Sequence, residues 1–457
     1  MNHQREQALA YLRANRDAFR RALGEILSIP SVSTDPAHAE DIRRAAAWVA
    51  DSLRALGMQR VEIFPTERHP VVYAEWLGAP GAPTVLIYGH YDVQPAEPLE
   101  LWESDPFRPA ERGENLYARG ASDMKGQVVA AFKAVEALMQ TGGLPVNLKW
   151  LIEGEEEIGS PSLGKFMSEH AGLLACDFAL NPDSGLLGKD WPTITYGLRG
   201  LAYFELRVYG PAHDLHSGLY GGVVHNPANA LAELIAGMHD AQGRVTLPGF
   251  YDRVRPLSDE ERAEMARLPV ADQHYLEQTG APALYGEAGY TANERVGARP
   301  TLDVNGLLAG FTGPGSKTVI PAWAMAKISC RLVPDQKPEE VHQQLLRYLE
   351  QNAPADIRWE LTSMHGAVAS ISDRHSPAIR AMERALETVW GRRPFFRREG
   401  GSIPVVGQMQ TLLGVESVIC GFGLPDDNVH APNEKQHLPT WYRGIETLTH
   451  FLLNLES

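Results

Sequence analysis

Apolar and polar positions in the first part of the chain follow helix and strand periods in turn. Apolar side chains recur every three or four positions over residues 6–26, 39–57 and 124–140, and this spacing predicts three helices. Short runs that are apolar and β-branched predict buried strands, because strands inside a parallel sheet are covered on both faces. These runs are residues 84–92, 146–152 and 177–183. Strands that alternate with helices predict a layered α/β domain.

The pattern changes near Tyr196. Strand-like runs then occur together with one clear helix at residues 338–349. The strand-like runs are residues 201–210, 326–334 and 357–363. Residues 243–299 are charged and contain proline and glycine, which predicts a partly helical excursion. Because the α/β alternation resumes at Ser376, we predict a smaller α+β domain inserted in the first one.

Composition narrows the class of protein. The 457 residues are 44% hydrophobic and 22% charged, which is typical of a globular protein with a sizeable core. The formal net charge of −15 argues against binding to nucleic acid and against binding to an anionic membrane surface. Three widely spaced cysteines predict a reducing compartment without a disulfide framework. The polar N-terminus does not resemble a signal peptide, and no apolar run could span a bilayer, so we expect a cytoplasmic protein.

Side chains that bind metals recur where the apolar runs end. They are His90 and Asp92, Asp123, the run Glu155–Glu157, Asp183 and His430. Taken singly, each has an ordinary structural explanation, such as a hydrogen-bonded core histidine or a solvated glutamate turn. Together they offer only nitrogen and oxygen ligands at the strand ends, where open α/β sheets place their sites. Two divalent ions would make such clustered acids favourable, because three ligand carboxylates and a bridging hydroxide balance four positive charges.

The glutamate run poses a geometric question. Adjacent strand residues point to opposite faces, so two neighbouring glutamates reach one site only if the backbone turns between them. Gly154 and Gly159 flank the run and permit such a turn. One glutamate could then bind metal while its neighbour moves a proton, and the spacing leaves open which does which. Ser160 and Pro161 follow and predict a helix start, because serine is a favoured N-cap and proline suits the first turn.

Seven motifs, in this order, resemble the M20 family of metallopeptidases. The motifs are YGHYDVQP (88–95), RGASDMKG (119–126), EGEEEIGS (153–160), NPDSG (181–185), YGLRG (196–200), DLHSGLYGG (214–222) and NEK (433–435). Within the family, the chain is most similar to the cytosolic non-specific dipeptidase and carnosinase branch. The resemblance implies an α/β fold, with a mixed-sheet zinc-peptidase-like catalytic domain and an inserted α+β lid and dimerisation domain. The expected bounds are 1–198 and 371–457 for the catalytic domain and 199–370 for the insert.

The resemblance also implies roles for the residues at matching positions. One metal ion would be held by His90, Asp123 and Asp183, and the other by Asp123, Glu157 and His430, with Asp123 bridging. Glu156 would be the general base and acid, Asp92 would orient a ligand, and Glu155 receives no role. On a strand, Asp92 faces the same side as His90 and could accept its second ring N–H. Met124 stands where many members of the branch carry a second acid, and we expect the metals to bind regardless.

Residues of the insert match the family's substrate-binding positions. His216 would cross to the active site of the partner in a homodimer and stabilise the oxyanion, although outside the motif it would pass for an ordinary loop histidine. Thr318 and Arg331 match substrate-binding stretches, and Arg331 suits a peptide's terminal carboxylate because its fork binds both oxygens. Ser402 lies in a loop that could hold the same carboxylate, and His365 could line the same site. The alternative for Arg331 is a salt bridge within a sheet.

These observations predict a cytoplasmic, homodimeric dinuclear metallopeptidase that hydrolyses dipeptides or other short peptides through a metal-bridging hydroxide. Aspartate at position 183 goes more often with dipeptidases and aminopeptidases of the family. The ligand set suits Zn²⁺ or Mn²⁺, and also Co²⁺. One alternative is an amidohydrolase of the same family that removes acyl groups from N-acyl amino acids. Another is a catalytically silent metal-binding scaffold, which we expect to lack Glu156 or a ligand, and none is missing.

Overall fold

The computed structural model describes residues 2–455 and contains two compact units. Unit 1 comprises Met1–Tyr196, Ser372–Arg397 and Gln408–Ser457, and unit 2 comprises Gly197–Ile371 and Arg398–Gly407. Arg398–Gly407 therefore groups with unit 2, whereas the predicted bounds place it in the second catalytic segment. The roles of the two parts as catalytic domain and lid stay predictions.

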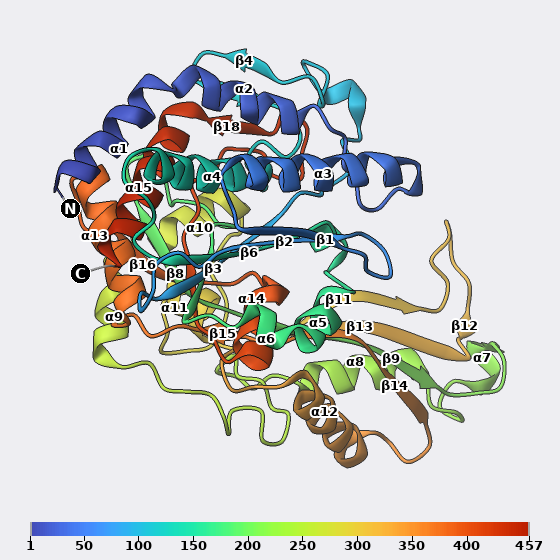
Figure 1. Ribbon diagram of the computed structural model, residues 1–457. Helices are drawn as coiled ribbons and strands as arrows, with labels where there is room; N and C mark the ends of the chain where they lie inside the picture. The colour runs from blue at the N-terminus through green and yellow to red at the C-terminus, as the bar shows by residue number, and fades with distance from the viewer. Residues whose placement is uncertain (1, 456–457) are drawn as a thin grey trace. The chain divides into compact units, whose positions relative to one another are not determined.

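Most strands of a nine-stranded mixed sheet belong to unit 1 (Figure 1). Along the sheet the strands are β1 (Arg60–Phe64), β2 (Val71–Trp76), β6 (Asn147–Glu153), β3 (Thr84–His90), β7 (Phe178–Asn181), β17 (Ser417–Ile419), β8 (Thr193–Leu198) and β15 (Ser370–Ile371), and β16 (Phe395–Glu399) also pairs with β8. The central strands β6, β3, β7 and β17 run parallel, and the remaining mapped pairs are antiparallel. The predicted mixed-sheet α/β fold is confirmed, and the three predicted buried runs are β3, β6 and β7.

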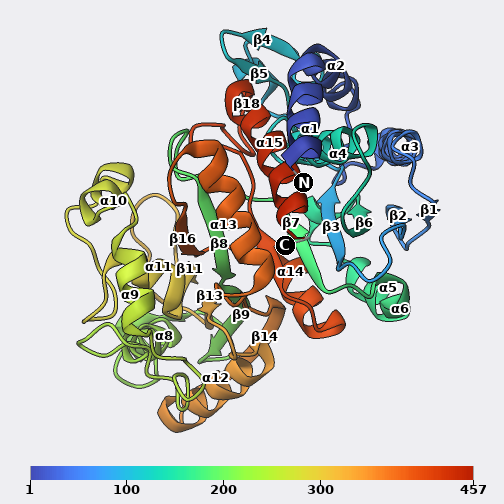
Figure 2. The ribbon, with the colours of Figure 1, turned by 60° about the vertical axis from the view of Figure 1, so that its left-hand side comes forward.

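Helices cover both faces of this sheet. They are α1 (Asn2–Ala14), α2 (Arg16–Leu27), α3 (Ala39–Ala55), α4 (Lys125–Gln140), α5 (Leu163–Glu169), α6 (Ala171–Leu174), α13 (Pro377–Trp390) and α15 (Leu438–Asn454). Helix α14 (Pro404–Gln408) lies almost wholly in the segment that groups with unit 2. Figures 1 and 2 show α3 and α4 over one face and α5 and α6 over the other. Helix α4 is buried along most of its length, because α1, α2 and α15 pack over it. Among residues 2–455, no helix is long and apolar enough to cross a membrane.

Short elements complete unit 1. They are the one-turn helices at Pro36–His38, Leu99–Leu101 and Glu156–Ile158, the π-helical turn at Met409–Leu413, and a small sheet of β18 (Lys435–His437), β5 (Asn115–Tyr117) and β4 (Ala110–Arg112). The turn at Glu156–Ile158 carries two of the three glutamates, so the backbone does turn at the point where the sequence predicts it.

Two local predictions need correction. The predicted helix over 6–26 is divided at Asn15, whose side-chain amide donates to Tyr11 O at 2.8 Å and so competes for a helix carbonyl. Ser160 does not cap a helix. Its φ is 51°, its hydroxyl donates to Glu153 Oε1 at 2.8 Å, and α5 begins only at Leu163. A tertiary hydrogen bond therefore takes the place of the local cap.

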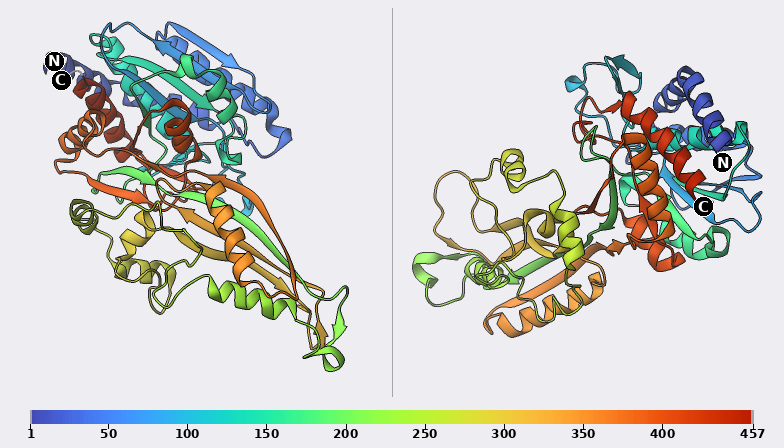
Figure 3. Two further views of the ribbon diagram at one scale, coloured as in Figure 1. Left: turned by 90° about the horizontal axis from the view of Figure 1, so that it is seen from below. Right: turned by 90° about the vertical axis from the view of Figure 1, so that its left-hand side faces the viewer.

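Unit 2 has a four-stranded antiparallel sheet in the order β11 (Thr301–Ala309), β13 (Trp323–Leu332), β9 (Gly200–Tyr209) and β14 (Arg358–Ala367). Helices α8 (Pro227–Gly237) and α12 (Pro338–Asn352) pack on it (Figure 3). Together they bury the apolar side chains of this sheet. Alternate residues of β9 are buried, as its period predicts. The remaining elements are α7 (Ser217–Tyr220), α9 (Asp259–Ala266), α10 (Asp272–Thr279), α11 (Ala292–Ala298), β10 (Leu215–His216) and β12 (Val319–Ile320).

A buried histidine on α15 gives unit 1 a pH-dependent stability. His450 is only 3% exposed, and burial together with the nearby charge of Arg5 lowers its pKa to about 4. Glu446 lies 3.9 Å away, too far to hydrogen-bond to the imidazole. His450 takes up a proton near pH 6.5 in the unfolded chain but not in the folded chain, so its contribution to stability is fully present above that pH and is lost as the pH falls toward 4.

We expect His450→Gln to remove about 2–3 kcal/mol of the stability difference between pH 7 and pH 4. Urea unfolding at several pH values gives the free energy of unfolding at each pH, and the variant should show a smaller slope of this free energy against pH. His3→Gln, which replaces an exposed histidine, serves as the control and should leave the slope as it is. Equal slopes for wild type and His450→Gln would show that His450 is protonated in the folded chain.

Candidate metal centre

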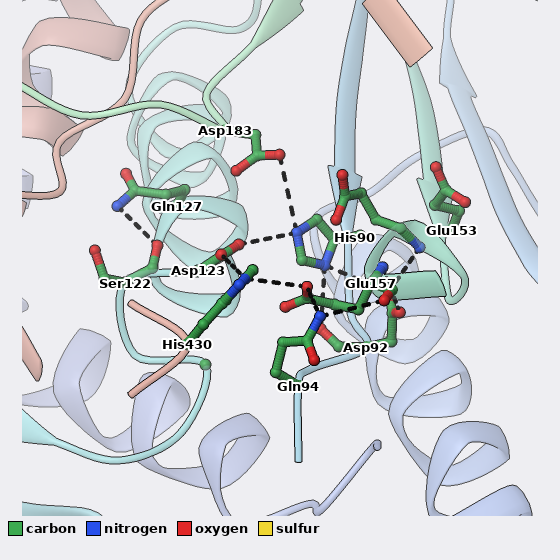
Figure 4. A network of polar contacts seen from close by, with 12 residues as sticks. His90, Asp92, Gln94, Ser122, Asp123, Gln127, Glu153, Glu157, Asp183 and His430 are labelled. Atoms are coloured by element: carbon green, nitrogen blue, oxygen red, sulfur yellow. Dashed lines mark hydrogen bonds and ion pairs between the residues drawn. The ribbon is translucent and has the colours of Figure 1, made fainter. Parts of the chain in front are cut away.

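The parallel strands of unit 1 bring distant residues to one edge of the sheet. Strands β6, β3 and β7 end at Glu153, His90 and Asn181, and their parallel register places these ends side by side. Asp183 follows β7 by two residues, and its backbone N–H donates to Asn181 Oδ1 at 2.8 Å. The carboxyl edge of a parallel sheet is where such folds bind ligands, and the predicted metal ligands lie there (Figure 4).

Asp123 lies between two groups of these side chains. Its Oδ1 is 3.1 Å from His90 Nε2, and that nitrogen is 4.0 Å from Asp183 Oδ2. Its Oδ2 is 3.0 Å from His430 Nε2, which is also 3.1 Å from Glu157 Oε2. Ligand atoms of His90, Asp123 and Glu157 lie within 4.8 Å of one another. The structure therefore brings together all five predicted ligands, with one carboxylate oxygen of Asp123 facing each group (Figure 4).

Asp92 connects His90 to the glutamate turn. Its carboxylate accepts the backbone N–H groups of Glu156 and Glu157 at 3.3 and 3.1 Å. Nδ1 of His90 lies 3.1 Å from the backbone oxygen of Asp92 and 3.4 Å from Oδ1. A fully buried aspartate in this place fixes the ring of His90 and the start of the turn together. The predicted orienting role of Asp92 fits this geometry.

Glu155, which has no role in the sequence-based prediction, is a buried anchor. It is 2% exposed, and its carboxylate accepts four hydrogen bonds at 2.8–2.9 Å. The donors are the Thr66 hydroxyl, the His69 backbone N–H and both the backbone N–H and the hydroxyl of Ser162. The first of the three glutamates thus ties the turn to the loop before β2, which leaves Glu156 and Glu157 for the metal centre.

We expect Glu155→Ala to lower the free energy of unfolding by about 2–4 kcal/mol, because it leaves four donors without their charged acceptor. Urea unfolding of the variant measures the loss. Glu169→Ala, at an exposed position on α5, is the matched control and should change stability by less than about 0.5 kcal/mol. If the two variants proved equally stable, Glu155 would not anchor the turn.

The electrostatics of the centre suit bound cations. Burial, and then the charge of Asp123, raise the pKa of Asp183 well above its usual range. Burial opposes ionisation of Asp123, yet hydrogen bonds with His430 and His90 hold its pKa below the usual value. The same contact with Asp123, with help from Glu157, raises the pKa of His430 to about 10. Carboxylates packed this densely repel one another, and divalent cations would stabilise them by direct coordination. The residues present therefore fit a divalent metal site.

Glu156 has a distinct electrostatic environment. Burial raises its pKa to about 7, with His90 acting against the shift and the charges of Glu157, Asp123 and Asp92 adding to it. A carboxyl group that titrates near neutral pH can both accept and donate a proton under physiological conditions. The raised pKa of Glu156 is compatible with the general-base role that the resemblance implies, and that role stays a prediction.

The sequence-based prediction missed two supports of the ligands. Gln94 donates from Nε2 to Glu157 Oε2 at 2.9 Å and so holds a predicted ligand. Glu434, which is 1% exposed, accepts four hydrogen bonds at 2.8–3.0 Å from the segment that ends in Asp123. The donors are Nη1 of Arg119 and the backbone N–H groups of Gly120, Ser122 and Asp123. The motif NEK after His430 is the signal that could have pointed to this residue.

Glu434 fixes the loop of His430 to the segment of Asp123. Asp427 adds to this link, because it accepts the Ser122 hydroxyl at 2.9 Å and Lys435 Nζ at 3.0 Å. Gly126 allows α4 to begin against the same segment, since a Cβ there would lie 2.1 Å from Ala121 O. The distance between the ligands Asp123 and His430 thus depends on the buried carboxylate of Glu434, which contacts the side chain of neither ligand.

We expect Glu434→Gln to weaken metal binding about 10- to 100-fold, because an amide presents one oxygen and turns two donors toward the donors of this segment. Competition with a chromophoric chelator measures the affinity. Glu100→Gln, at an exposed position, is the control and should bind as wild type does. A Glu434→Gln protein with unchanged affinity would mean that the loop keeps its geometry without this carboxylate.

The predicted substrate-binding residues all belong to unit 2. Arg331 on β13 donates from Nη1 to Ser402 Oγ at 3.1 Å, and Ser402 Oγ donates to a backbone oxygen at 2.7 Å, so the structure brings these two together. His365 stacks on Tyr203 with ring centroids 5.0 Å apart. Thr318 is exposed, and so is His216, whose Nδ1 accepts the Gly218 N–H at 3.0 Å at the start of α7. Their roles toward substrate stay predictions.

Comparison with known proteins identifies the family. The model of peptidase family M20/M25/M40 matches residues 86–454. The chain is 32% identical to the Cys-Gly metallodipeptidase DUG1 of Candida albicans over 95% of this chain and 94% of that protein. It is also 32% identical to human Beta-Ala-His dipeptidase, over 98% of this chain and 92% of that protein.

Solved structures agree with this result. The M20 family metallo-carboxypeptidase Sso-CP2 from Sulfolobus solfataricus superimposes with a TM-score of 0.83 and 34% identity, over 96% of this chain and 99% of that one. Human carnosine dipeptidase 1 superimposes with a TM-score of 0.78 and 31% identity, over 99% and 98%. The resemblance stated from the motifs is confirmed. The chain belongs to peptidase family M20/M25/M40 and is a peptide-bond hydrolase of that family.

Proposed function

We propose that this protein is a dinuclear metal-dependent dipeptidase. The observation that carries the proposal is the position of Asp123, whose two carboxylate oxygens face His90 and His430 at 3.1 and 3.0 Å. Asp183 completes one ligand group and Glu157 the other. Relatives that match almost the whole chain are named as dipeptidases, which supports short peptides as substrates.

The bound ions would polarise the scissile carbonyl and lower the pKa of water. Glu156 takes a proton from the attacking water and delivers it to the leaving amine, since its pKa of about 7, raised chiefly by burial, suits both transfers. Asp92 keeps Glu156 in place through the hydrogen bond that it accepts from the Glu156 backbone N–H. Because the same carboxylate lies 3.4 Å from His90 Nδ1, base and ligand are oriented together.

Residues of unit 2 recognise the substrate in this proposal. Arg331 and Ser402 bind the terminal carboxylate of the peptide, because guanidinium and hydroxyl donors suit a carboxylate and are already joined by a hydrogen bond. Thr318 and His365 contribute further contacts. The partner subunit's His216 stabilises the oxyanion in a homodimer, and the exposure of His216 supports its availability for this role. The proposed metals are Zn²⁺ or Mn²⁺, with Co²⁺ as a further candidate, and the proposed compartment is the cytoplasm.

Hydrolysis of a small substrate panel tests this function. The protein is stripped of metal, restored with Zn²⁺ or Mn²⁺, and assayed with free dipeptides beside N-acyl amino acids. We expect metal-dependent turnover of the dipeptides. Turnover of N-acyl amino acids alone would assign the protein to the deacylases of the family. No turnover with both metals bound would indicate a silent scaffold.

A further inference from the structure

Unit 2 contains a pocket that the proposed chemistry does not explain. Its volume is about 810 Å³, within the usual range for small-molecule sites, and its walls come from β11, β13, α11 and the loop around residues 239–245. Four arginines line it: Arg199, Arg295, Arg299 and Arg331. Only two carboxylates, Glu287 and Asp303, line the same pocket.

One of these arginines is fully compensated. Arg299 forms a two-pronged ion pair with Glu287, with N–O distances of 2.7 and 2.8 Å, and both side chains are buried. Its guanidinium also lies over the rings of Tyr290 and Tyr251. A bidentate, stacked arginine of this kind belongs to the wall of the pocket. It does not remain available to a ligand.

The other three donate to neutral acceptors among the described residues. Arg199 donates to Gly400 O at 3.2 Å and Arg299 O at 3.4 Å. Arg295 donates from Nε to Glu287 O at 3.0 Å, and Arg331 donates to the Ser402 hydroxyl at 3.1 Å. None of the three has a carboxylate within 4.0 Å in the described part of the chain.

Charge in the pocket is therefore unbalanced. Three guanidinium groups face one carboxylate, the exposed Asp303, which leaves two positive charges. Burial, and then the charge of Arg331, lower the pKa of Arg199 to about 10, so the arginines act on one another across this space. A ligand with two negative charges would neutralise the excess. A single carboxylate on Arg331 would leave one charge for Arg199 and Arg295 to share.

We propose that this arginine pocket receives the C-terminal residue of the substrate and selects dipeptides in which that residue is glutamate or aspartate. The inference rests on the proposed function, in which Arg331 holds the terminal carboxylate. Arg295 and Arg199 then bind the carboxylate of the side chain. Arg295 is the better probe of the two, because it is half-buried on α11 and its removal leaves the core of unit 2 intact.

Two nearly isosteric dipeptides, Ala-Glu and Ala-Gln, test the preference through the ratio of their kcat/KM values. We expect wild type to favour Ala-Glu by about 10- to 100-fold, mainly through KM, since a charge-assisted hydrogen bond to the side chain is lost with Ala-Gln. In Arg295→Gln the ratio should fall toward one, and in Arg295→Lys it should be intermediate, because a point charge replaces the fork. Arg347→Gln removes an exposed arginine of unit 2 outside the pocket and should keep the wild-type ratio.

Because both substrates are assayed on one preparation, the ratio is insensitive to the fraction of folded protein. A wild-type ratio near one, with both dipeptides hydrolysed, overturns the pocket assignment and leaves the dipeptidase function standing. A high ratio that Arg295→Gln retains also overturns it. Hydrolysis of neither dipeptide nor of any other in the panel overturns the proposed function, and the pocket assignment with it.

Discussion

Glu156→Gln should lower kcat by about 10²- to 10⁴-fold while the protein keeps its metal. An amide has nearly the size and shape of the carboxyl group but cannot take the proton of the attacking water. The environment that raises the pKa of Glu156 to about 7, chiefly burial, favours a neutral side chain in this position, so glutamine should fit without strain. Steady-state kinetics measures the loss, and elemental analysis of the dialysed protein measures the metal.

The control for this variant is Glu169→Gln, which replaces an exposed glutamate of the same unit and should hydrolyse peptides at the wild-type rate. Nearly normal turnover of the Glu156→Gln protein would show that a group other than Glu156 transfers the proton. A protein that lost its metal together with activity would make Glu156 a ligand and would exchange the proposed roles of Glu156 and Glu157.

Asp123→Asn should affect both metal ions at once. The two carboxylate oxygens of Asp123 face His90 and His430, and an amide offers one uncharged oxygen in their place. We expect the affinity for each ion to fall by more than about 100-fold, since even changes outside the ligand set cost 10- to 100-fold. Turnover should fall with it. Titration of the metal-free protein, followed by elemental analysis after dialysis, gives the number of ions bound.

Comparison with Asp183→Asn shows whether Asp123 differs from a ligand that serves a single ion. Asp183 lies 4.0 Å from His90 Nε2, and no contact with His430 links it to the other group in the described structure. This variant should therefore lose one ion and keep the other. If Asp123→Asn likewise lost a single ion, Asp123 would serve one metal only, and the dinuclear arrangement would need a different bridge.

The helices and strands of this protein were predictable in segments where the hydrophobic positions follow one regular period. The runs at β3, β6 and β7 are covered on both faces, so their apolar composition identifies them without knowledge of their neighbours. The single helix predicted over residues 6–26 and the helix start predicted at Ser160 were wrong, because side-chain hydrogen bonds of Asn15 and Ser160 outweigh propensity there. Ser160 binds Glu153, a partner that no local rule selects.

The sequence by itself determined which residue types gather at the strand ends, because motif order and strand period are properties of the chain alone. His90, Asp123, Glu157, Asp183 and His430 were all named from it. Three identical glutamates in a row could not be told apart by composition. The motif resemblance assigns Glu156 and Glu157 and leaves Glu155 without a role, and the folded structure supplies the physical difference, since Thr66, His69 and Ser162 bind Glu155, and Asp92 holds the backbone of the next two.

The tertiary structure alone decided the long-range supports. Glu434 lies more than 300 positions from the segment that it binds. The three arginines of the pocket come from the residue before β9, from α11 and from β13. Hydrogen bonds and charge balance depend on distances of a few ångströms, and separation along the chain does not encode such distances. Local periods in the sequence therefore determined the helices, the strands and the types of ligand residue. The packing of these elements determined which side chains pair through hydrogen bonds and ion pairs.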